Sequence, residues 1–272
     1  MYMMDLLRCP VCREPLHTED RTARCANGHA FDFAREGYLN LLAGSHKAGS
    51  ATGDSRTMAL ARRKFLDKGY FAPLRDAAAE NMARFAACGA ALDICCGEGY
   101  YSSALQAAGN EVYAFDLSKE MVRLAARRGE ARCFVANISA IPLPDESIRT
   151  AIHLFAPFHD AEFSRILHPD GALLTVVPGR RHLMGMKEVL YDAPYENDEA
   201  PPSAPSFVIA ERRTVRADVT IRGREDIAAV LNMTPYGVRS PRTGIERLLA
   251  LDVLHTPLEF VLYILRKRTD RT

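Results

Sequence analysis

Residues 92–101 have the sequence LDICCGEGYY, in which a short apolar run leads into a loop containing two glycines. An apolar run of this length, bounded by glycine, is typical of a buried strand, and residues 100–109 (YYSSALQAAG) continue as a helix ending at Gly109. Glycines at a strand-to-helix turn let the backbone approach a ligand closely. This stretch therefore predicts the first strand and helix of an open α/β sheet, with a ligand crevice at its carboxyl edge.

Strands and helices alternate on the C-terminal side of this stretch. Helical patterns cover residues 118–129, with Ser118 as the N-cap, and residues 162–167. The further strands are expected at 111–116, 131–136, 150–156 and 172–177. Such alternation implies right-handed crossovers and a parallel sheet core.

The flanking regions add helices and a last pair of strands. A helix is expected at 73–87, with Pro73 near its first turn. Beyond residue 178 we expect helices at 182–191, 227–232 and 245–251, a loop at 192–206, and strands at 213–221 and 258–268.

The bulk composition is that of a soluble globular protein. Of 272 residues, 48% are hydrophobic and 25% charged, and the formal net charge is +1. No apolar run is long enough for a membrane span, and the start resembles no signal peptide, so we expect a cytoplasmic protein without a membrane partner. The two ends are slightly basic and the middle slightly acidic, which fits a polyanionic partner and fits ordinary surface solvation equally well.

The first thirty residues carry a metal-binding pattern. Cys9 and Cys12 form one close pair, and Cys25 and His29 form a second pair in CANGH. Two such pairs, each on a tight turn, supply the four ligands of a tetrahedral, closed and therefore structural zinc site. A redox dithiol is the alternative for a lone C-x-x-C, but such a motif belongs within a βαβ unit. His17 is the alternative fourth ligand.

Acidic and amide side chains follow the predicted strands around the glycine loop. Asp93 lies within the first strand, Asp116 ends the second and can bind ribose hydroxyls, and Asn137 follows the third and can contact adenine. NAD is disfavoured because Ser102 replaces the third glycine of its fingerprint and Glu98 would meet its pyrophosphate. The cationic sulfonium of S-adenosylmethionine tolerates acidic surroundings, and its carboxylate can face the next helix N-terminus. These residues indicate S-adenosylmethionine as the cofactor.

Over nearly its whole length the sequence resembles the RlmA-type 23S rRNA guanine-N1-methyltransferases. The zinc motif joined to G-H-x-F-D-x-A-x-E-G-Y-x-N-L-L is highly specific, whereas the glycine motif is shared by many methyltransferases. The stretches that carry the resemblance are CPVC, CANGHAFD, EGYLNLL, ARRKFLDKGYFAPLRD, LDICCGEGYY, VVPGRRHLMGMKEVLY and LNMTPY.

The resemblance implies a Rossmann-like class I methyltransferase domain with an N-terminal zinc module, methylating N1 of a guanine in a 23S rRNA hairpin loop. It also implies a homodimer, structural zinc on the four ligands, and cofactor contacts from Gly97, Glu98 and His182, beside Gly99 in the same loop. Phe71 stands where relatives have a Tyr beside the cofactor, which keeps an aromatic face but loses a hydroxyl. Cys95 stands where relatives have Gly, and its Cβ is tolerable there if φ is negative.

We divide the chain into a zinc-binding module for RNA recognition (1–43), a linker with a basic segment (44–72) and a methyltransferase domain (73–272). The arginines expected to face RNA from the module are Arg8, Arg13, Arg21, Arg24 and Arg35. They equally suit plain solvation of a small module.

The acceptor pocket is expected after the fourth strand, near residues 156–159, where Phe158 can stack on an extruded base. The general base stays unassigned among His159, Asp160 and His182, and residues 234–236 could close over the pocket. Two alternatives remain: a small-molecule methyltransferase, suggested by IPLPDES and RILHPDG, and a non-catalytic zinc RNA-binding protein.

Overall fold

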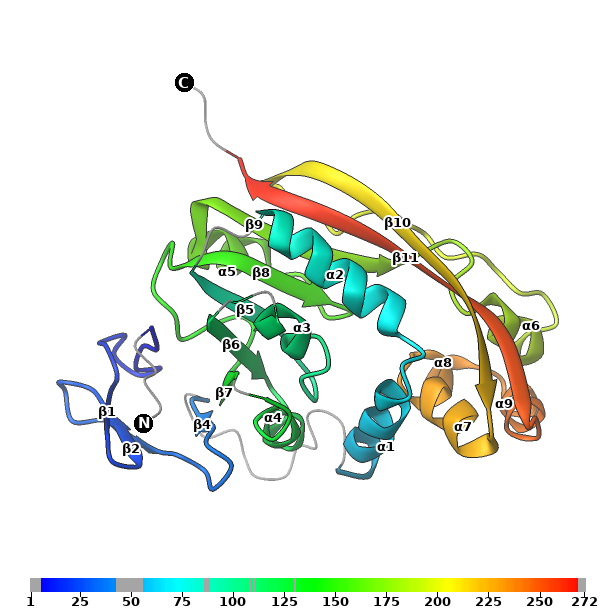
Figure 1. Ribbon diagram of the computed structural model, residues 1–272, viewed down its shortest axis with the longest axis horizontal. Helices are drawn as coiled ribbons and strands as arrows, with labels where there is room; N and C mark the ends of the chain where they lie inside the picture. Colours follow the sequence, from blue (N-terminus) through cyan, green and yellow to red (C-terminus); the bar gives the residue numbers. More distant parts are fainter. Residues whose placement is uncertain are drawn as a thin grey trace.

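Two sheets, one small and one large, organise the chain in the computed structural model (Figure 1). The residues that it describes are 6–42, 56–85, 89–107, 109, 111–129 and 131–268. The expected linker at 44–54 lies outside them. The small antiparallel sheet contains β1 (His17–Glu19), β2 (Thr22–Arg24) and β3 (Ala30–Asp32).

The large sheet has the strand order β10-β11-β9-β8-β5-β6-β7-β4. Its strands are β4 (Leu39–Asn40), β5 (Ala90–Ile94), β6 (Glu111–Asp116), β7 (Arg132–Val135), β8 (Ile148–Leu154), β9 (Leu167–Pro178), β10 (Phe207–Arg222) and β11 (Val253–Lys267). The six strands from β4 to β9 are parallel to their neighbours, and β11 and β10 add an antiparallel pair. The parallel core is therefore confirmed. Because β5 pairs with β6 on one side and β8 on the other, the chain order reverses there, which places a crevice at their carboxyl ends.

The helices agree with the sequence patterns at most positions. They are α1 (Arg56–Asp67), α2 (Ala72–Phe85), α3 (Ser102–Ala107), α4 (Lys119–Ala125), α5 (Asp160–Ile166), α6 (Met184–Leu190), α7 (Arg224–Asn232), α8 (Tyr236–Arg239) and α9 (Arg242–Leu249). The Ser118 side chain accepts a hydrogen bond from the backbone N–H of Met121, as expected of an N-cap. Helix α1 was not expected, although its buried residues Ala59, Phe65 and Leu66 lie on one helical face.

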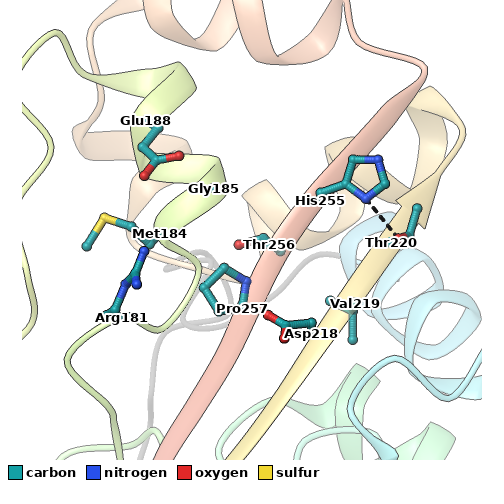
Figure 2. A pocket seen from close by; sticks show the side chains of 10 residues that line it. All are labelled: Arg181, Met184, Gly185, Glu188, Asp218, Val219, Thr220, His255, Thr256 and Pro257. Carbon is teal, nitrogen blue, oxygen red and sulfur yellow. Dashed lines mark hydrogen bonds between the residues drawn. The ribbon is translucent and has the colours of Figure 1, made fainter.

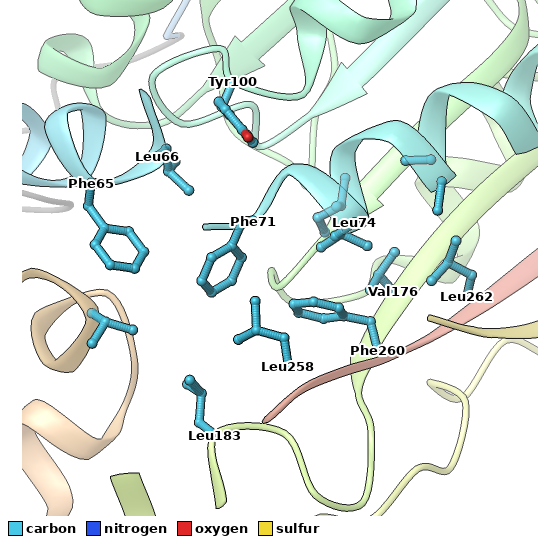
Figure 3. Close-up of a cluster of buried hydrophobic side chains, with 14 of the residues drawn as sticks. Phe65, Leu66, Phe71, Leu74, Tyr100, Val176, Leu183, Leu258, Phe260 and Leu262 are labelled. Carbon is cyan, nitrogen blue, oxygen red and sulfur yellow. The ribbon is translucent and has the colours of Figure 1, made fainter. Parts of the chain in front are cut away.

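Successive residues of the central strands pack into two different cores, as the period of a strand requires. On one face Ala91 and Phe260 join a cluster with α1, α2 and α7 that includes Phe65 and Phe71 (Figure 3). On the other face Leu92 and its equivalents meet α5 and the zinc module. The module contributes Leu7, Cys9, Leu16, Cys25, Phe33, Leu39 and Leu41 to that second cluster.

The zinc module is therefore part of the sheet's packing rather than an appendage. Its β4 pairs in parallel with β7, as Leu39 opposes Phe134. Figure 1 shows the module at one end of the sheet and the group of α6 to α9 at the other. Among the described residues no helix combines the length and the apolar character that a membrane crossing needs.

Candidate metal centre and cofactor site

Cys9, Cys12, Cys25 and His29 converge, with all four ligand atoms within 4.8 Å of one another. The Sγ atoms of Cys12 and Cys25 are 3.6 Å apart, and Nδ1 of His29 lies 3.6 Å from Cys9 Sγ and 3.4 Å from Cys25 Sγ. Tetrahedral zinc with bonds of about 2.0–2.3 Å separates its ligands by roughly 3.5–3.8 Å. The donor set and its spacing fit a closed, structural zinc ion.

Two tight turns bring these ligands together. In the first turn the N–H of Arg13 donates to the carbonyl of Cys9, and in the second Gly28 has φ 81 and donates to Cys25. A backbone hydrogen bond at Glu14 is the main cause that lowers the pKa of Cys12 to about 6, which favours the thiolate that binds metal. His17 lies on β1, outside the cluster.

The arginines of the module differ in their surroundings. The Arg13 guanidinium donates to the carbonyls of Ile141 and Leu143 and so ties the module to the sheet domain. Arg21 donates to two carbonyls of its own module, and Arg24 forms an exposed ion pair with Glu19. Within the described residues the side chains of Arg8 and Arg35 make no hydrogen bond or ion pair, and that of Arg35 is exposed.

The glycine loop after β5 turns through three left-handed residues: Cys95 (φ 58), Gly97 (φ 56) and Gly99 (φ 87). The condition under which a side chain at position 95 is tolerable, a negative φ, is therefore not met, and Cys95 occupies the left-handed region. A Cβ on Gly99 would lie 3.0 Å from Cα of Ala125 in α4, so this glycine permits close packing of loop on helix. A Cβ on Gly97 would meet Nη1 of Arg62 at 3.9 Å, an ordinary van der Waals distance.

Asp116 and Asn137 lie at the carboxyl ends of neighbouring strands, β6 and β7. The Asp116 carboxylate accepts hydrogen bonds from the N–H groups of Gly97 (3.0 Å) and Ser118 (2.8 Å), which places it against the loop. Oδ1 of Asn137 accepts from the backbone and hydroxyl of Ser139. Both residues therefore border the crevice that the strand order creates.

Asp93 and Glu98 are buried beneath the loop. Burial raises the pKa of Asp93 to about 7, although the Ser102 hydroxyl donates to it at 2.6 Å. Burial also raises the pKa of Glu98, opposed by its ion pair with Arg128. Arg128 in turn contacts Asp67 of α1 at 2.7 Å. The Glu98 side chain therefore joins the loop to α1.

Phe71 and His182 meet around Phe260, with ring centroids 5.6 Å and 4.6 Å from that of Phe260. Burial, and then the charge of Lys187, lower the pKa of His182 to about 3, so its ring is neutral at physiological pH. Its Nδ1 accepts a hydrogen bond from the N–H of Glu259 (3.3 Å), which leaves the proton on Nε2. His182 is therefore a hydrogen-bond donor and poorly suited to be a general base.

Lys187 is a buried charged residue near His182 that the sequence analysis did not single out. It is fully buried in α6, and its ammonium donates to the carbonyl of Tyr195 (2.8 Å) and to Oδ1 of Asn197 (2.7 Å). The Asn197 amide then donates to the carbonyls of Gly179 (2.8 Å) and His182 (3.4 Å). Lys187 thus holds the segment that carries His182, with an apolar run around it as the only sequence signal.

The segment after β8 places its aromatic residues differently from expectation. Phe158 packs against His153 and Phe163 in the second cluster. Phe155 has φ 57 and is 49% exposed, and its ring centroid lies 5.9 Å from that of Phe260. Since β8 pairs with β5, Phe155 stands at the level of the glycine loop. The exposed aromatic face at this edge is therefore that of Phe155.

The candidate general bases differ in their hydrogen-bond partners. The Asp160 carboxylate accepts hydrogen bonds from the hydroxyl (2.6 Å) and N–H (3.1 Å) of Ser206 and so holds the entry to β10. The half-buried His159 side chain makes no hydrogen bond to another described residue. In the segment 234–236, the Tyr236 hydroxyl donates to Asn197 at 3.3 Å.

A further hollow of about 330 Å³ lies between α6 and the β10–β11 ribbon (Figure 2). Charged side chains from both elements line it, including Arg181, Glu188 and Asp218, and His255 is hydrogen-bonded to Thr220 (2.9 Å). None of the expected site residues lines this hollow, so it is separate from the glycine-loop crevice.

Comparison with known proteins assigns both parts of the chain. A family model described as the N-terminal zinc ribbon of RlmA matches residues 7–50, and one described as a methyltransferase domain matches residues 91–171. The zinc ribbon agrees with the converged ligands and the methyltransferase domain with the crevice. The protein is a methyltransferase that uses S-adenosylmethionine and carries a structural zinc ion.

Three relatives are similar over most of their length. A Streptomyces fradiae protein named 23S rRNA (guanine(748)-N(1))-methyltransferase is 40% identical over 191 residues, which cover 68% of this chain and 67% of that protein. A Micromonospora griseorubida protein is 37% identical (68% and 69% covered), and Bacillus subtilis YxjB is 30% identical (89% and 90% covered). The names of the last two proteins assign them, as putative members, to the 23S rRNA (guanine-N1)-methyltransferases. This chain belongs to the RlmA-type family of 23S rRNA (guanine-N1)-methyltransferases.

Proposed function

We propose that this chain transfers a methyl group from S-adenosylmethionine to N1 of a guanine in a hairpin loop of 23S rRNA. The observation that carries the proposal is the union of a zinc ribbon and a methyltransferase crevice on one sheet. A small-molecule methyltransferase shares the crevice but has no use for a zinc module packed against it. The names of the relatives supply the RNA and the atom.

The cofactor is proposed to lie over the glycine loop. Asp116 binds the ribose hydroxyls, Asn137 contacts adenine, and Gly97, which has no side chain, lets the methionine part approach the backbone. Gly99, Asp93 and Glu98 act indirectly, since they shape the loop through Ala125, Ser102 and Arg128. Phe71 and His182 are proposed to close the site from the Phe260 side, with Nε2–H of His182 as a donor.

S-adenosylmethionine supplies an electrophilic methyl group, and the residues of the chain align the acceptor with it. Phe155 offers an exposed ring on which an extruded guanine can stack at the crevice. Neutral guanine carries a proton on N1 that has to leave. Of the three candidate bases, we favour His159, because Asp160 holds Ser206 and the Nδ1 of His182 is already engaged.

Single-stranded loops suit this site better than duplex RNA. A loop base exposes its Watson–Crick edge, whereas a paired guanine hides N1 in a hydrogen bond. Arg8 and Arg35 of the zinc module are proposed to contact phosphates of the hairpin, and such binding weakens as salt rises. A homodimer and a cytoplasmic location, where ribosomal RNA is modified, complete the proposal.

Methylation of total rRNA from a strain lacking the gene, with labelled cofactor and purified protein, tests this function. The label should enter 23S rRNA, and primer extension should stop at one guanine, because N1 methylation blocks base pairing. Guanine 748, the position in the name of the Streptomyces fradiae relative, is the first to inspect. Absence of label in 23S rRNA, with intact cofactor binding, would favour the small-molecule alternative. Absence of cofactor binding would favour the non-catalytic one.

A further inference from the structure

The hollow between α6 and the β10–β11 ribbon lies beside the cofactor site (Figure 2). The turn after β9 separates the two, and it is fixed to β11 because the N–H of Leu183 donates to the carbonyl of Pro257 (2.8 Å). From this turn His182 packs against Phe260 on the side proposed for the cofactor, whereas Arg181 lines the hollow. The hollow therefore borders the place where an RNA strand would bring its reacting base.

Three charged side chains border this hollow without a protein partner. Arg181 and Glu188 come from the α6 side and Asp218 comes from β10. Within the part of the chain that the structure describes, their side chains make no hydrogen bond or ion pair. In the ring of His255, Nδ1 is hydrogen-bonded to Thr220 (2.9 Å) and Nε2 has no described partner. These groups are available to a ligand.

A buried hydroxyl also lines the hollow. Thr256 is 3% exposed, and its Oγ1 has no hydrogen-bond partner among the described residues. Buried polar atoms in native proteins are almost always hydrogen-bonded, so this oxygen calls for a partner from outside the chain. Ligand pockets have volumes of about 300–1,000 Å³. The hollow, at about 330 Å³, is large enough for a single small group such as a nucleobase.

The charges of these side chains select among the parts of an RNA. Two carboxylates repel phosphate, so the hollow suits a base better than the backbone. Guanine presents two adjacent donors, N1–H and the N2 amino group, and two acceptors, O6 and N7. A carboxylate accepts both donors, and a guanidinium donates to both acceptors. Asp218 and Arg181 lie on different sides of the hollow and match these two edges of one guanine.

We propose that the hollow binds a second, unpaired guanine of the RNA substrate, with its N1 and N2 groups on Asp218 and its O6 and N7 on Arg181. This inference rests on the proposed function, because it takes the substrate to be an RNA loop. It adds a site that selects the RNA by sequence, separate from the crevice where the methyl group is transferred. It also gives a role to the part of the ribbon that extends beyond Pro178, where β9 ends.

Fluorescence anisotropy with the 23S rRNA hairpin around guanine 748 tests the proposal. Each unpaired guanine other than the methylated one is replaced in turn by inosine, which lacks the N2 amino group, or by 7-deazaguanine, which lacks N7. At one position both replacements should weaken binding roughly fivefold or more. Asp218→Asn should weaken binding of the unmodified hairpin to a similar extent and should no longer respond to inosine at that position. Arg181→Gln should no longer respond to 7-deazaguanine there.

The sign of the Asp218→Asn effect is itself diagnostic, because loss of a carboxylate ordinarily strengthens binding to a polyanion. Glu225→Gln removes an exposed carboxylate of α7 outside the hollow and is the matched control, which should not weaken binding. Thermal unfolding of each variant shows whether a loss of binding reflects a damaged fold.

Unchanged or stronger binding of the hairpin by Asp218→Asn, or an undiminished response of this variant to inosine, would overturn the proposal. The same result is expected if a partner protein, rather than RNA, occupies the hollow. An unaltered chain that neither binds nor methylates the hairpin would contradict the proposed function and this inference with it. An unaltered chain that methylates the hairpin while no second guanine responds would contradict this inference alone.

Discussion

Cys95 combines a side chain with a left-handed backbone at the tip of β5, where φ is 58. This region costs a non-glycine residue about 1–2 kcal/mol, and a β-branched residue more. We predict that Cys95→Val lowers the free energy of unfolding by about 2 kcal/mol or more. Cys95→Gly should stay within about 1 kcal/mol of the unaltered chain, because relief of strain offsets added chain entropy and lost packing. Urea unfolding of the three proteins measures this, and equal stability of Val and Gly variants would contradict a positive φ.

Asp93 should make stability depend on pH. Its pKa is about 7 in the folded chain, raised by burial from an unfolded value near 3.8. A raised carboxyl pKa means that folding favours the neutral form, so this stabilisation is present at low pH and is lost as pH rises through 7. Relative to Asp93→Asn, the unaltered chain should lose at least about 1 kcal/mol of unfolding free energy between pH 5.5 and 8.

Urea unfolding of both cofactor-free proteins at the two pH values provides the measurement. The other titrating groups, zinc ligands included, occur in both proteins and cancel in the difference. A difference that does not change with pH, or that changes with the opposite sign, would show that the Asp93 carboxyl titrates normally.

Phe155 tests the acceptor side of the crevice. Stacking of a base on an aromatic ring is worth about 1–3 kcal/mol, so Phe155→Ala should lower kcat/KM for 23S rRNA roughly tenfold or more. The affinity for S-adenosylmethionine should not change, and Phe155→Tyr should retain activity. Val238→Ala, at another exposed apolar residue (92%), is the control. Full RNA activity of the alanine variant would exclude stacking on Phe155.

The zinc ligands could be predicted from the sequence, whereas the positions of the aromatic residues after β8 could not. Ligand spacing within each pair predicts the turns, because the chemistry of the metal demands them, and the four ligand atoms converge as expected. Phe155 and Phe158 are indistinguishable by type and spacing after a strand end. Only the packing of Phe158 against Phe163 and His153 separates them, and that packing depends on residues remote in the sequence.

At the scale of elements, the local sequence pattern predicted the bounds of a strand that is buried on both faces. It did not predict the bounds of strands whose length depends on their partner strand. Strand β6 was predicted with its observed bounds, 111–116. Strand β10 runs over 207–222 rather than 213–221, because its antiparallel partner β11 lengthens it. Strand β4 has two residues and exists only through β7, so no local signal could reveal it.

Helix α1 is the most consequential element that the sequence interpretation missed. Its basic residues include the run Arg62, Arg63 and Lys64, and residues 44–72 were interpreted as a linker with a basic segment. The spacing of Ala59, Phe65 and Leu66 on one face was the available signal. The same helix brings Nη1 of Arg62 to within 3.9 Å of the position that a Cβ on Gly97 would take.

At the scale of the whole molecule, the zinc module and the methyltransferase domain share one hydrophobic cluster and one sheet. Hydrogen bonds reinforce the union. The backbone N–H of Arg8 donates to the carbonyl of Pro142 (2.9 Å), and the Arg13 guanidinium donates to the carbonyls of Ile141 and Leu143. A module of this size depends on its metal to fold. Loss of zinc should therefore uncover one face of the sheet as well as unfold the module.

We accordingly predict that the protein unfolds in a single thermal transition, and that removing zinc with a chelator, or by Cys25→Ser, lowers Tm by roughly 5 °C or more. Cofactor binding should persist below the new Tm, because the helices on the opposite face still support the glycine loop. Scanning calorimetry provides the measurement, with chelator added to Cys25→Ser as the control that should show no further shift. A main transition that keeps its Tm while a separate, small transition disappears would mean that the module folds independently and that the shared cluster contributes little to stability.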